Sequence, residues 1–244
     1  MQLRSVLEYK FAILSSAAFI IIPYYTWKSF YRTYKSLKRQ YDEEILFSKR
    51  HDCVVMYSSN KGMYGWPPYR ERIVADITDE NWCDKLYEPI IYFIDTAKFT
   101  LDVAIMMITI KQIYQALIDA QKRGVKVRIL LNFEHSENML PQIRECIKGG
   151  LDVQLYIPQK TNLSNIMHYK YMVKDYSRTG GYVLVGSMNF TSTAFLENYE
   201  DVVISSNHYI VTGFHNNFDK CFKFVMDDNE SLINKTILLD VNLA

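Results

Sequence analysis

The chain has 244 residues, of which 49% are hydrophobic and 23% charged, and this composition excludes a wholly disordered chain. The length accommodates one ordinary domain with an appendage. The net charge of +1 is unevenly placed: residues 1–50 carry 9 Lys/Arg and 4 Asp/Glu, and residues 51–244 carry 19 and 23. The larger part is therefore slightly acidic, which argues against a nucleic-acid enzyme that is basic throughout but leaves room for a local basic cleft.

Residues 11–27 contain no charged residue and predict a transmembrane anchor of nearly minimal length. Aromatic residues at the end of this segment fit an interfacial belt, and the Lys/Arg excess that follows places the rest of the chain in the cytosol. The alternatives are a cleaved signal peptide, for which the following residues make a poor cleavage site, and a helix buried in a core. Residues 29–50 read as a basic helical stalk. The predicted domains are therefore 1–50, anchor and stalk, and 51–244, the catalytic domain.

Residues 51–244 are predicted to form an α/β domain, a mixed β-sheet flanked by helices on both faces. Residues 60–79 are rich in turn-forming residues and predict a surface loop, and residues 100–131 read as a right-handed strand–helix–strand unit. Strands are expected at 54–57, 100–107, 125–131, 153–156, 182–187 and 201–204, with one more at the motif described below. Helices are expected from 79 or 81 to about 98, and at 109–123, 138–148 and 208–227.

The cysteine pattern predicts free thiols in a reducing compartment, because no pair has the spacing of a disulfide framework or a C-x2-C zinc site. The four cysteines are Cys53, Cys83, Cys146 and Cys221. His51 lies two residues before Cys53, and with Cys83 as the only further ligand nearby this makes a weak zinc candidate. We therefore predict neither a metal site nor a cofactor.

The most informative segment is His168-Tyr169-Lys170, followed by Asp175 in the spacing H-x-K-x4-D. On a strand, residues two apart share a face, so His168 and Lys170 are expected to lie side by side. The imidazole is a nucleophile for phosphorus and the ammonium is a fixed charge for phosphate oxygens, as phosphoryl transfer requires. Residues 186–189, Gly-Ser-Met-Asn, then end an apolar strand and offer neutral hydrogen bonds.

Together these residues resemble the catalytic motif of the phospholipase D superfamily. The order of elements from about residue 81 to 225 is most similar to the mitochondrial cardiolipin hydrolase family, whose insect members are called Zucchini. The resemblance implies these site residues: His168, Lys170, Asp175 and Glu200 for catalysis, and Ser187 and Asn189 for binding phosphate. Glu200 matches a carboxylate that orients the histidine, although a surface acid before a strand is an alternative. The implied chemistry uses no metal and no cofactor, because a histidine replaces an activated water.

This chemistry needs two histidines, one to form a phosphohistidine and one to protonate the leaving oxygen. The chain has a single H-x-K-x4-D motif. The other histidines, none with Lys two residues later, are His51, His135, His208 and His215. A homodimer is therefore expected, with both His168 side chains facing one phosphate at a two-fold axis.

The resemblance implies a membrane-anchored phosphodiesterase on the cytosolic side of the mitochondrial outer membrane. Its leading predicted activity is endonucleolytic cutting of single-stranded RNA, as in processing of piRNA precursors. The alternative is hydrolysis of cardiolipin to phosphatidic acid, and a non-catalytic scaffold is a third alternative that the intact motif argues against. An RNA site predicts a narrow groove lined by Lys160, Lys174 and Arg178, with Tyr169 and Tyr171 nearby, whereas a lipid site predicts a wide apolar mouth.

Two departures from the family pattern concern the expected rim of the cleft. Residues 58–82 contain neither Cys nor His, so the small zinc module of the family is missing from the sequence. Residues 178–181 lengthen the turn that follows Asp175. Both departures are expected to alter substrate choice and not the chemistry.

Overall fold

The structure is a computed structural model that describes residues 2–59, 62–67, 82–158 and 165–230. The chain divides into two compact units, residues 1–48 and residues 49–244. Three predicted features lie wholly or largely outside the described residues: the segment around Lys160, most of the segment 58–82, and the tail beyond residue 230.

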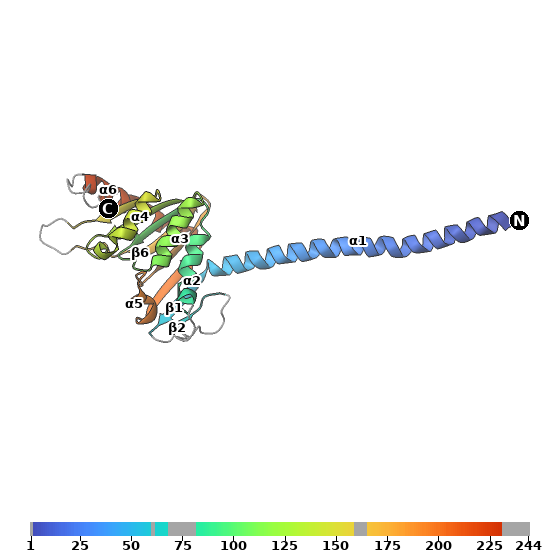
Figure 1. Ribbon diagram of the computed structural model, residues 1–244, viewed down its shortest axis with the longest axis horizontal. Helices are drawn as coiled ribbons and strands as arrows, with labels where there is room; N and C mark the ends of the chain where they lie inside the picture. The colour runs from blue at the N-terminus through green and yellow to red at the C-terminus, as the bar shows by residue number, and fades with distance from the viewer. Residues whose placement is uncertain (1, 60–61, 68–81, 159–164, 231–244) are drawn as a thin grey trace. The chain divides into compact units, whose positions relative to one another are not determined.

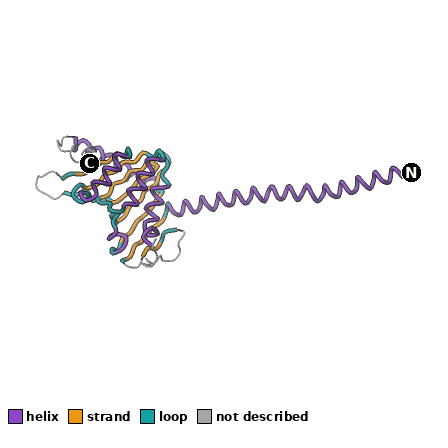
Figure 2. Tube along the Cα trace, in the orientation of Figure 1, coloured by secondary structure: helices purple, strands orange, loops and turns teal. Residues whose placement is uncertain are grey.

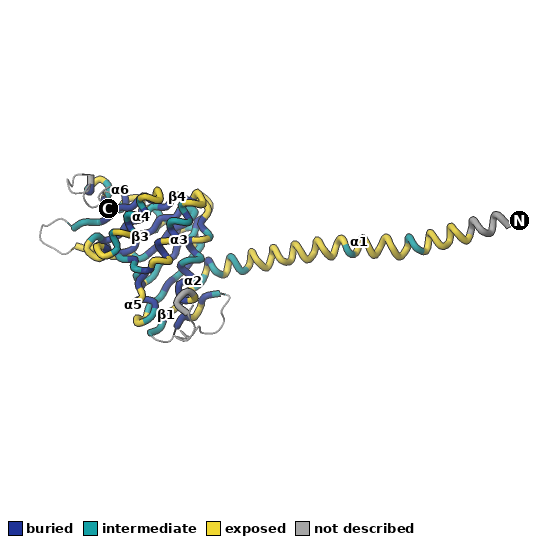
Figure 3. Tube along the Cα trace, in the orientation of Figure 1, coloured by how far each residue is buried: buried dark blue, intermediate teal, exposed yellow. Residues whose placement is uncertain are grey.

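The first unit consists of a single α-helix, α1 (Gln2–Arg50), which continues through Pro23. Most of its described side chains are exposed (Figure 3). Among the described residues, no helix is both long enough and apolar enough to cross a membrane. The transmembrane anchor predicted at residues 11–27 is therefore not supported. The uncharged run falls short of the ~20 apolar residues of a span, and its serine, threonine, tyrosine and proline residues lower its hydropathy further.

The second unit is built on one mixed sheet, as predicted (Figures 1 and 2). The sheet has eight strands in the order β2-β1-β8-β7-β6-β3-β4-β5. The strands are β1 (Cys53–Ser58), β2 (Gly62–Tyr64), β3 (Thr100–Ile105), β4 (Lys126–Asn132), β5 (Asp152–Tyr156), β6 (Lys170–Ser177), β7 (Gly180–Gly186) and β8 (Glu200–Ser205). β3, β4 and β5 are parallel to one another, and all other neighbours are antiparallel. The carboxyl ends of β3 and β4 therefore lie at the same edge of the sheet as the start of β6 and the end of β7.

Helices cover both faces of the sheet, as predicted. They are α2 (Trp82–Asp95), α3 (Lys111–Lys122), α4 (Leu140–Lys148), α5 (Ser192–Leu196) and α6 (His208–Glu230), with a short 3-10 helix at Glu137–Met139. Alternate strand residues feed two cores: Val103 and Ile105 pack with residues of α2, α3 and α4, and Ala104 packs with residues of α6. β2 and α5 were not predicted, because segments of three and five residues are too short for a periodic pattern to be detected.

Candidate active site

His168 lies in the segment directly before β6, and its side chain is exposed. The segment is attached to the end of β3, because the backbone N–H of Met106 donates to the carbonyl of Tyr169 at 2.9 Å. β6 begins only at Lys170, so the expectation that His168 and Lys170 share a strand face is wrong in detail. The two residues are nevertheless neighbours, since the Lys170 ammonium donates to the His168 carbonyl at 3.1 Å.

Lys170 is half-buried at the start of β6. Burial lowers the pKa of its ammonium, and the negative charge of Glu200 acts in the opposite direction. Burial also removes part of the hydration of the ammonium, which strengthens its attraction for a phosphate oxygen.

Glu200 is the first residue of β8, and both of its carboxylate oxygens accept hydrogen bonds. One oxygen accepts from the Ser187 hydroxyl, and the other accepts from the Asn198 amide at 2.9 Å. The hydroxyl of Ser187 also accepts from the backbone N–H of Asp201 at 3.1 Å. Ser187, predicted to bind phosphate, therefore holds Glu200 in this structure. Asn198 has the same role and was not predicted, although its place in Asn198-Tyr199-Glu200 was a usable signal.

The close approach of β7 and β8 at this point depends on Gly186. A Cβ atom there would lie 1.9 Å from the carbonyl oxygen of Asp201, a distance that no side chain tolerates. The glycine thus lets Ser187 reach Glu200 across the two strands. The motif Gly-Ser is explained by this backbone contact and not only by hydrogen bonding to substrate.

Asn189 lies two residues after Ser187, beyond the end of β7. Its segment is held against the end of β3, because Phe190 donates to the Met107 carbonyl at 3.2 Å and Thr109 donates to the Phe190 carbonyl at 2.9 Å. Among the described residues, the Asn189 Oδ1 atom is buried without a hydrogen-bond partner. Since the oxygen and nitrogen of an amide exchange by rotation, Asn189 retains an unused polar atom for a ligand, consistent with its predicted role at phosphate.

Asp175 is not part of this cluster. Its carboxylate accepts from the backbone N–H groups of Lys98 at 3.0 Å, Phe99 at 2.7 Å and Thr100 at 3.2 Å, where the chain turns from α2 into β3. At about 3.3 Å per strand residue, this position is roughly 17 Å from Lys170 along β6. The carboxylate predicted to be catalytic therefore closes a turn at the opposite end of the strand.

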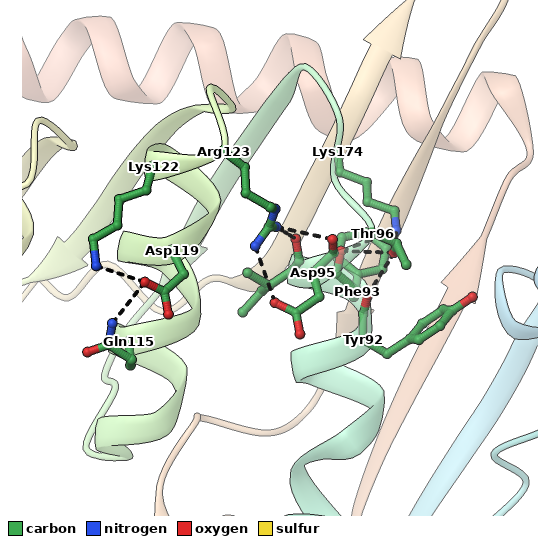
Figure 4. A network of polar contacts seen from close by, with 10 residues as sticks. Tyr92, Phe93, Asp95, Thr96, Gln115, Asp119, Lys122, Arg123 and Lys174 are labelled. Carbon is green, nitrogen blue, oxygen red and sulfur yellow. Dashed lines mark hydrogen bonds and ion pairs between the residues drawn. The ribbon is translucent and has the colours of Figure 1, made fainter.

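Lys174 does not line a groove either. It is fully buried, and its ammonium donates to the Phe93 carbonyl at 3.1 Å and to the Thr96 hydroxyl (Figure 4). The ammonium lies 4.4 Å from the ring centre of Phe93 and 5.4 Å from that of Tyr182. Burial lowers its pKa to about 7. Lys174 is thus a core residue that fastens β6 to the end of α2.

The rest of the predicted RNA groove is also dispersed. Arg178 lies in the turn between β6 and β7, at the sheet edge opposite His168. Tyr171 is buried, and its hydroxyl accepts from the Asn217 amide at 2.9 Å. Of the predicted groove residues that the structure describes, only Tyr169 lies beside His168, with 39% of its surface exposed.

Comparison with known proteins identifies the family. Residues 90–222 match the family described as "Cardiolipin synthase, PLD-like domain". The chain belongs to this phospholipase D-like family. This confirms the resemblance that the motif predicted.

Individual relatives of this phospholipase D-like chain are distant. A mitochondrial cardiolipin hydrolase of Chlamydomonas reinhardtii is 27% identical over 52% of this chain and 53% of its own length. A phospholipase D of Rickettsia conorii is 32% identical over 42% of this chain and 47% of its own length. The chain thus spans about half the length of these curated relatives. Among solved structures, the phospholipase D family member Nuc from Salmonella typhimurium is 24% identical with a TM-score of 0.48, covering 55% of this chain and 84% of Nuc.

A groove of about 750 Å³ opens directly beside His168 in the phospholipase D-like domain. Its walls are the ends of β4 and β5, the segment before β6, and the last turns of α6. The lining residues are Leu130, Tyr156, Ile166, Met167, His168, Tyr169, Lys220, Cys221, Phe224 and Val225. Among the lining residues that the structure describes, Lys220 is the one lysine or arginine, and the remaining described walls are largely apolar. Sequence reasoning missed the groove because its walls come from four separate segments.

One cluster among the described residues has the composition of a metal site: Asp102, His215 and Asp219. Its two carboxylates are both bound by Arg128, which donates to Asp102 at 2.7 Å and to Asp219 at 2.8 Å. The cluster is therefore an ion-pair network that holds α6 to the sheet. The weak zinc pair is also explained otherwise, because the His51 ring packs 4.5 Å from that of Tyr182.

Proposed function

We propose that this chain is a phosphodiesterase that acts as a two-fold homodimer through a phosphohistidine. His168 of one protomer attacks phosphorus, and the bond from phosphorus to the leaving oxygen breaks. The imidazolium of the partner's His168 gives its proton to that oxygen. Water then attacks phosphorus and loses a proton to the partner's imidazole, the phosphorus–nitrogen bond breaks, and both histidines return to their initial states.

The observation that carries this proposal is the single exposed imidazole beside Lys170. The other histidines have other environments: His51 is buried against aromatic rings, and His208 and His215 stack along Tyr176. His135 is exposed in the turn after β4. A second copy of His168 is therefore the simplest supply of the second proton-transfer group.

The remaining polar residues have supporting roles in this proposal. Lys170 and Asn189 hold the phosphate oxygens as negative charge develops on them. Glu200, fixed by Ser187 and Asn198, favours the charged form of Lys170 and orients the imidazole at the axis. Asp175 holds the turn before β3 and touches no reacting atom.

The groove favours a phospholipid as the substrate class, with cardiolipin the first candidate. A single-stranded nucleic acid needs a row of cations along its backbone, and the described lining of the groove offers one lysine, Lys220. An acyl chain needs an apolar channel that begins at the phosphodiester, and the groove begins at His168. Single-stranded RNA is the second candidate, because exposed Tyr169 and Phe224 offer faces on which bases stack.

A paired assay tests the substrate class. The purified full chain is given cardiolipin vesicles and, separately, a labelled single-stranded RNA, both in EDTA. We expect release of phosphatidic acid and no dependence on divalent metal. Cutting of RNA with no lipid turnover would instead support the second candidate, and activity that needs added metal would contradict the phosphohistidine chemistry. The names of the relatives make a mitochondrial membrane the first location to examine.

A further inference from the structure

Asn132, the last residue of β4, carries an amide that the fold leaves unused. The side chain is fully buried, with an exposed fraction of 0%. Among the residues that the structure describes, neither its Nδ2 atom nor its Oδ1 atom has a hydrogen-bond partner. Burial removes the water that would otherwise bond the amide, so an unpartnered asparagine in a core lowers stability. The fold alone therefore gives no reason for a polar side chain here, whereas a ligand that completes its hydrogen bonds does.

The strand register directs Asn132 toward the groove beside His168. Leu130, two residues earlier on β4, lines this groove, and so does Tyr156, the partner of Asn132 on β5. Residues two apart on a strand, and residues paired across two strands, point to the same face of a sheet. Asn132 therefore points from the sheet to the face on which the groove lies.

Asn132 is also close to a substrate held at His168. The backbone N–H of Asn132 donates to the Met106 carbonyl at 3.2 Å, and that of Met106 donates to the Tyr169 carbonyl at 2.9 Å. Two strand spacings of about 4.8 Å therefore separate Asn132 from Tyr169, the neighbour of His168. Met106 lies between them and Met167 lines the groove, and methionine side chains repack readily around a ligand. A ligand that enters the groove can therefore reach the amide.

We propose that Asn132 is a specificity-determining residue, which binds a free hydroxyl group on the alcohol part of the substrate phosphodiester. This inference rests on the proposed hydrolysis of phospholipids. An amide both donates and accepts hydrogen bonds, and a hydroxyl is a group that does both in return. The glycerol that joins the two phosphates of cardiolipin carries such a hydroxyl on its central carbon, a few bonds from phosphorus. That hydroxyl contacts Asn132 while the phosphate is held at His168.

Two lipids that differ only in hydroxyl groups test this assignment. Phosphatidylglycerol and phosphatidylpropanol have the same charge and a three-carbon alcohol each, and they compete in one vesicle with different isotope labels. Labelled phosphatidic acid from each lipid is quantified. We expect the full-length wild type to prefer phosphatidylglycerol by at least about 10-fold in kcat/KM, because the analogue leaves the buried amide unpaired. In Asn132→Leu, which is similar in shape and forms no hydrogen bond, the preference should disappear, and Asn132→Ala should lose it as well.

The matched control is Gln154→Leu, which changes a buried amide on the same face of β5. Its side chain is partnered, since it accepts from the Asn229 amide at 3.4 Å and donates to Asp152 at 3.3 Å. Gln154→Leu should therefore melt at a lower temperature and keep the lipid preference, whereas Asn132→Leu should melt at or above the temperature of wild type.

Three results would overturn the assignment of Asn132. They are an intact preference in Asn132→Leu, a wild type that hydrolyses both lipids equally, and a fall in melting temperature of Asn132→Leu as large as that of Gln154→Leu. A wild type that cuts RNA and neither lipid would overturn the lipid as the bound substrate. Hydrolysis of bis(p-nitrophenyl) phosphate by wild type tests the proposed function separately, because this diester has no hydroxyl group, and its absence together with inactivity on both lipids would overturn that function itself.

Discussion

The two ends of β6 carry the same motif and have opposite physical character. At the start of the strand, His168 is exposed and Lys170 is half-buried beside an anionic Glu200. At the other end, Lys174 is fully buried and the Asp175 carboxylate is occupied by backbone N–H groups. One motif in the chain thus combines residues for the chemistry with residues that hold the fold. The comparison predicts that substitutions at the first end change turnover, and that substitutions at the second change stability.

The largest expected effect is on turnover in His168→Asn. The amide cannot form a phosphohistidine or transfer the proton, so we expect kcat to fall on the order of 10⁴-fold or more. The melting temperature should stay within a degree or two, because the side chain is exposed. The control is His135→Asn, another exposed histidine, which should retain full activity. Equal losses in both variants would contradict the assignment of His168 as the catalytic histidine.

Asp175→Ala is expected to lower stability and to leave turnover nearly unchanged, which is the reverse of His168→Asn. The change removes a carboxylate that accepts three backbone hydrogen bonds and places alanine at a φ of 52°. We expect the free energy of unfolding to drop by about 3 kcal/mol, while kcat per folded molecule stays within a few-fold of wild type. Asp175→Asn keeps an oxygen acceptor and tolerates this φ, so its loss should be smaller. A stable but inactive Asp175→Ala chain would restore Asp175 to the catalytic group.

Asn198→Ala tests whether the hydrogen bonds that hold Glu200, at the catalytic end of β6, contribute to turnover. It removes one of two hydrogen bonds to the Glu200 carboxylate, and we expect kcat to fall about 10-fold with KM little changed. With one donor lost, the Glu200 carboxylate is held less firmly. The control is Tyr199→Ala, which truncates a neighbour that is 73% exposed. An unchanged kcat per folded molecule would show that Asn198 acts only on the fold.

The buried Lys174 is expected to have a smaller effect, a dependence of the free energy of unfolding on pH. Burial lowers its folded pKa to about 7, whereas the unfolded value is near 10.5. Between these values the unfolded chain binds more protons than the folded chain, so the contribution of Lys174 to stability rises with pH from about 7 to 10. The free energy of unfolding of wild type should therefore rise over this window relative to Lys174→Met. Parallel curves for the two proteins would mean that Lys174 stays charged in the core.

The sequence was sufficient for the features that depend on local spacing. Alternation and 3.6-residue periodicity located the long strands and helices, and H-x-K-x4-D identified His168 and Lys170 as neighbours at the site. Local spacing did not reveal that Asp175 serves a turn 75 residues earlier in the chain, because that partnership depends on strand pairing. The groove escaped prediction for the same reason, since Tyr156, Tyr169 and Phe224 meet only in the folded chain. The anchor predicted at residues 11–27 is not supported, because a run without charged residues is weaker evidence for a membrane span than a sustained run of apolar residues.

The most direct test of the account measures whether two chains share one site. Wild-type and His168→Ala chains are co-expressed with different tags, and the mixed dimer is purified and assayed for phosphodiester hydrolysis. A shared site leaves the mixed dimer with one imidazole, so its activity should be lower than that of the wild-type dimer by about 10²–10⁴-fold. An unselected equal mixture should then retain about a quarter of wild-type activity, the share of wild-type dimers under random pairing. A mixed dimer with half of the wild-type activity would contradict the account, because each protomer would then hold a complete and independent site.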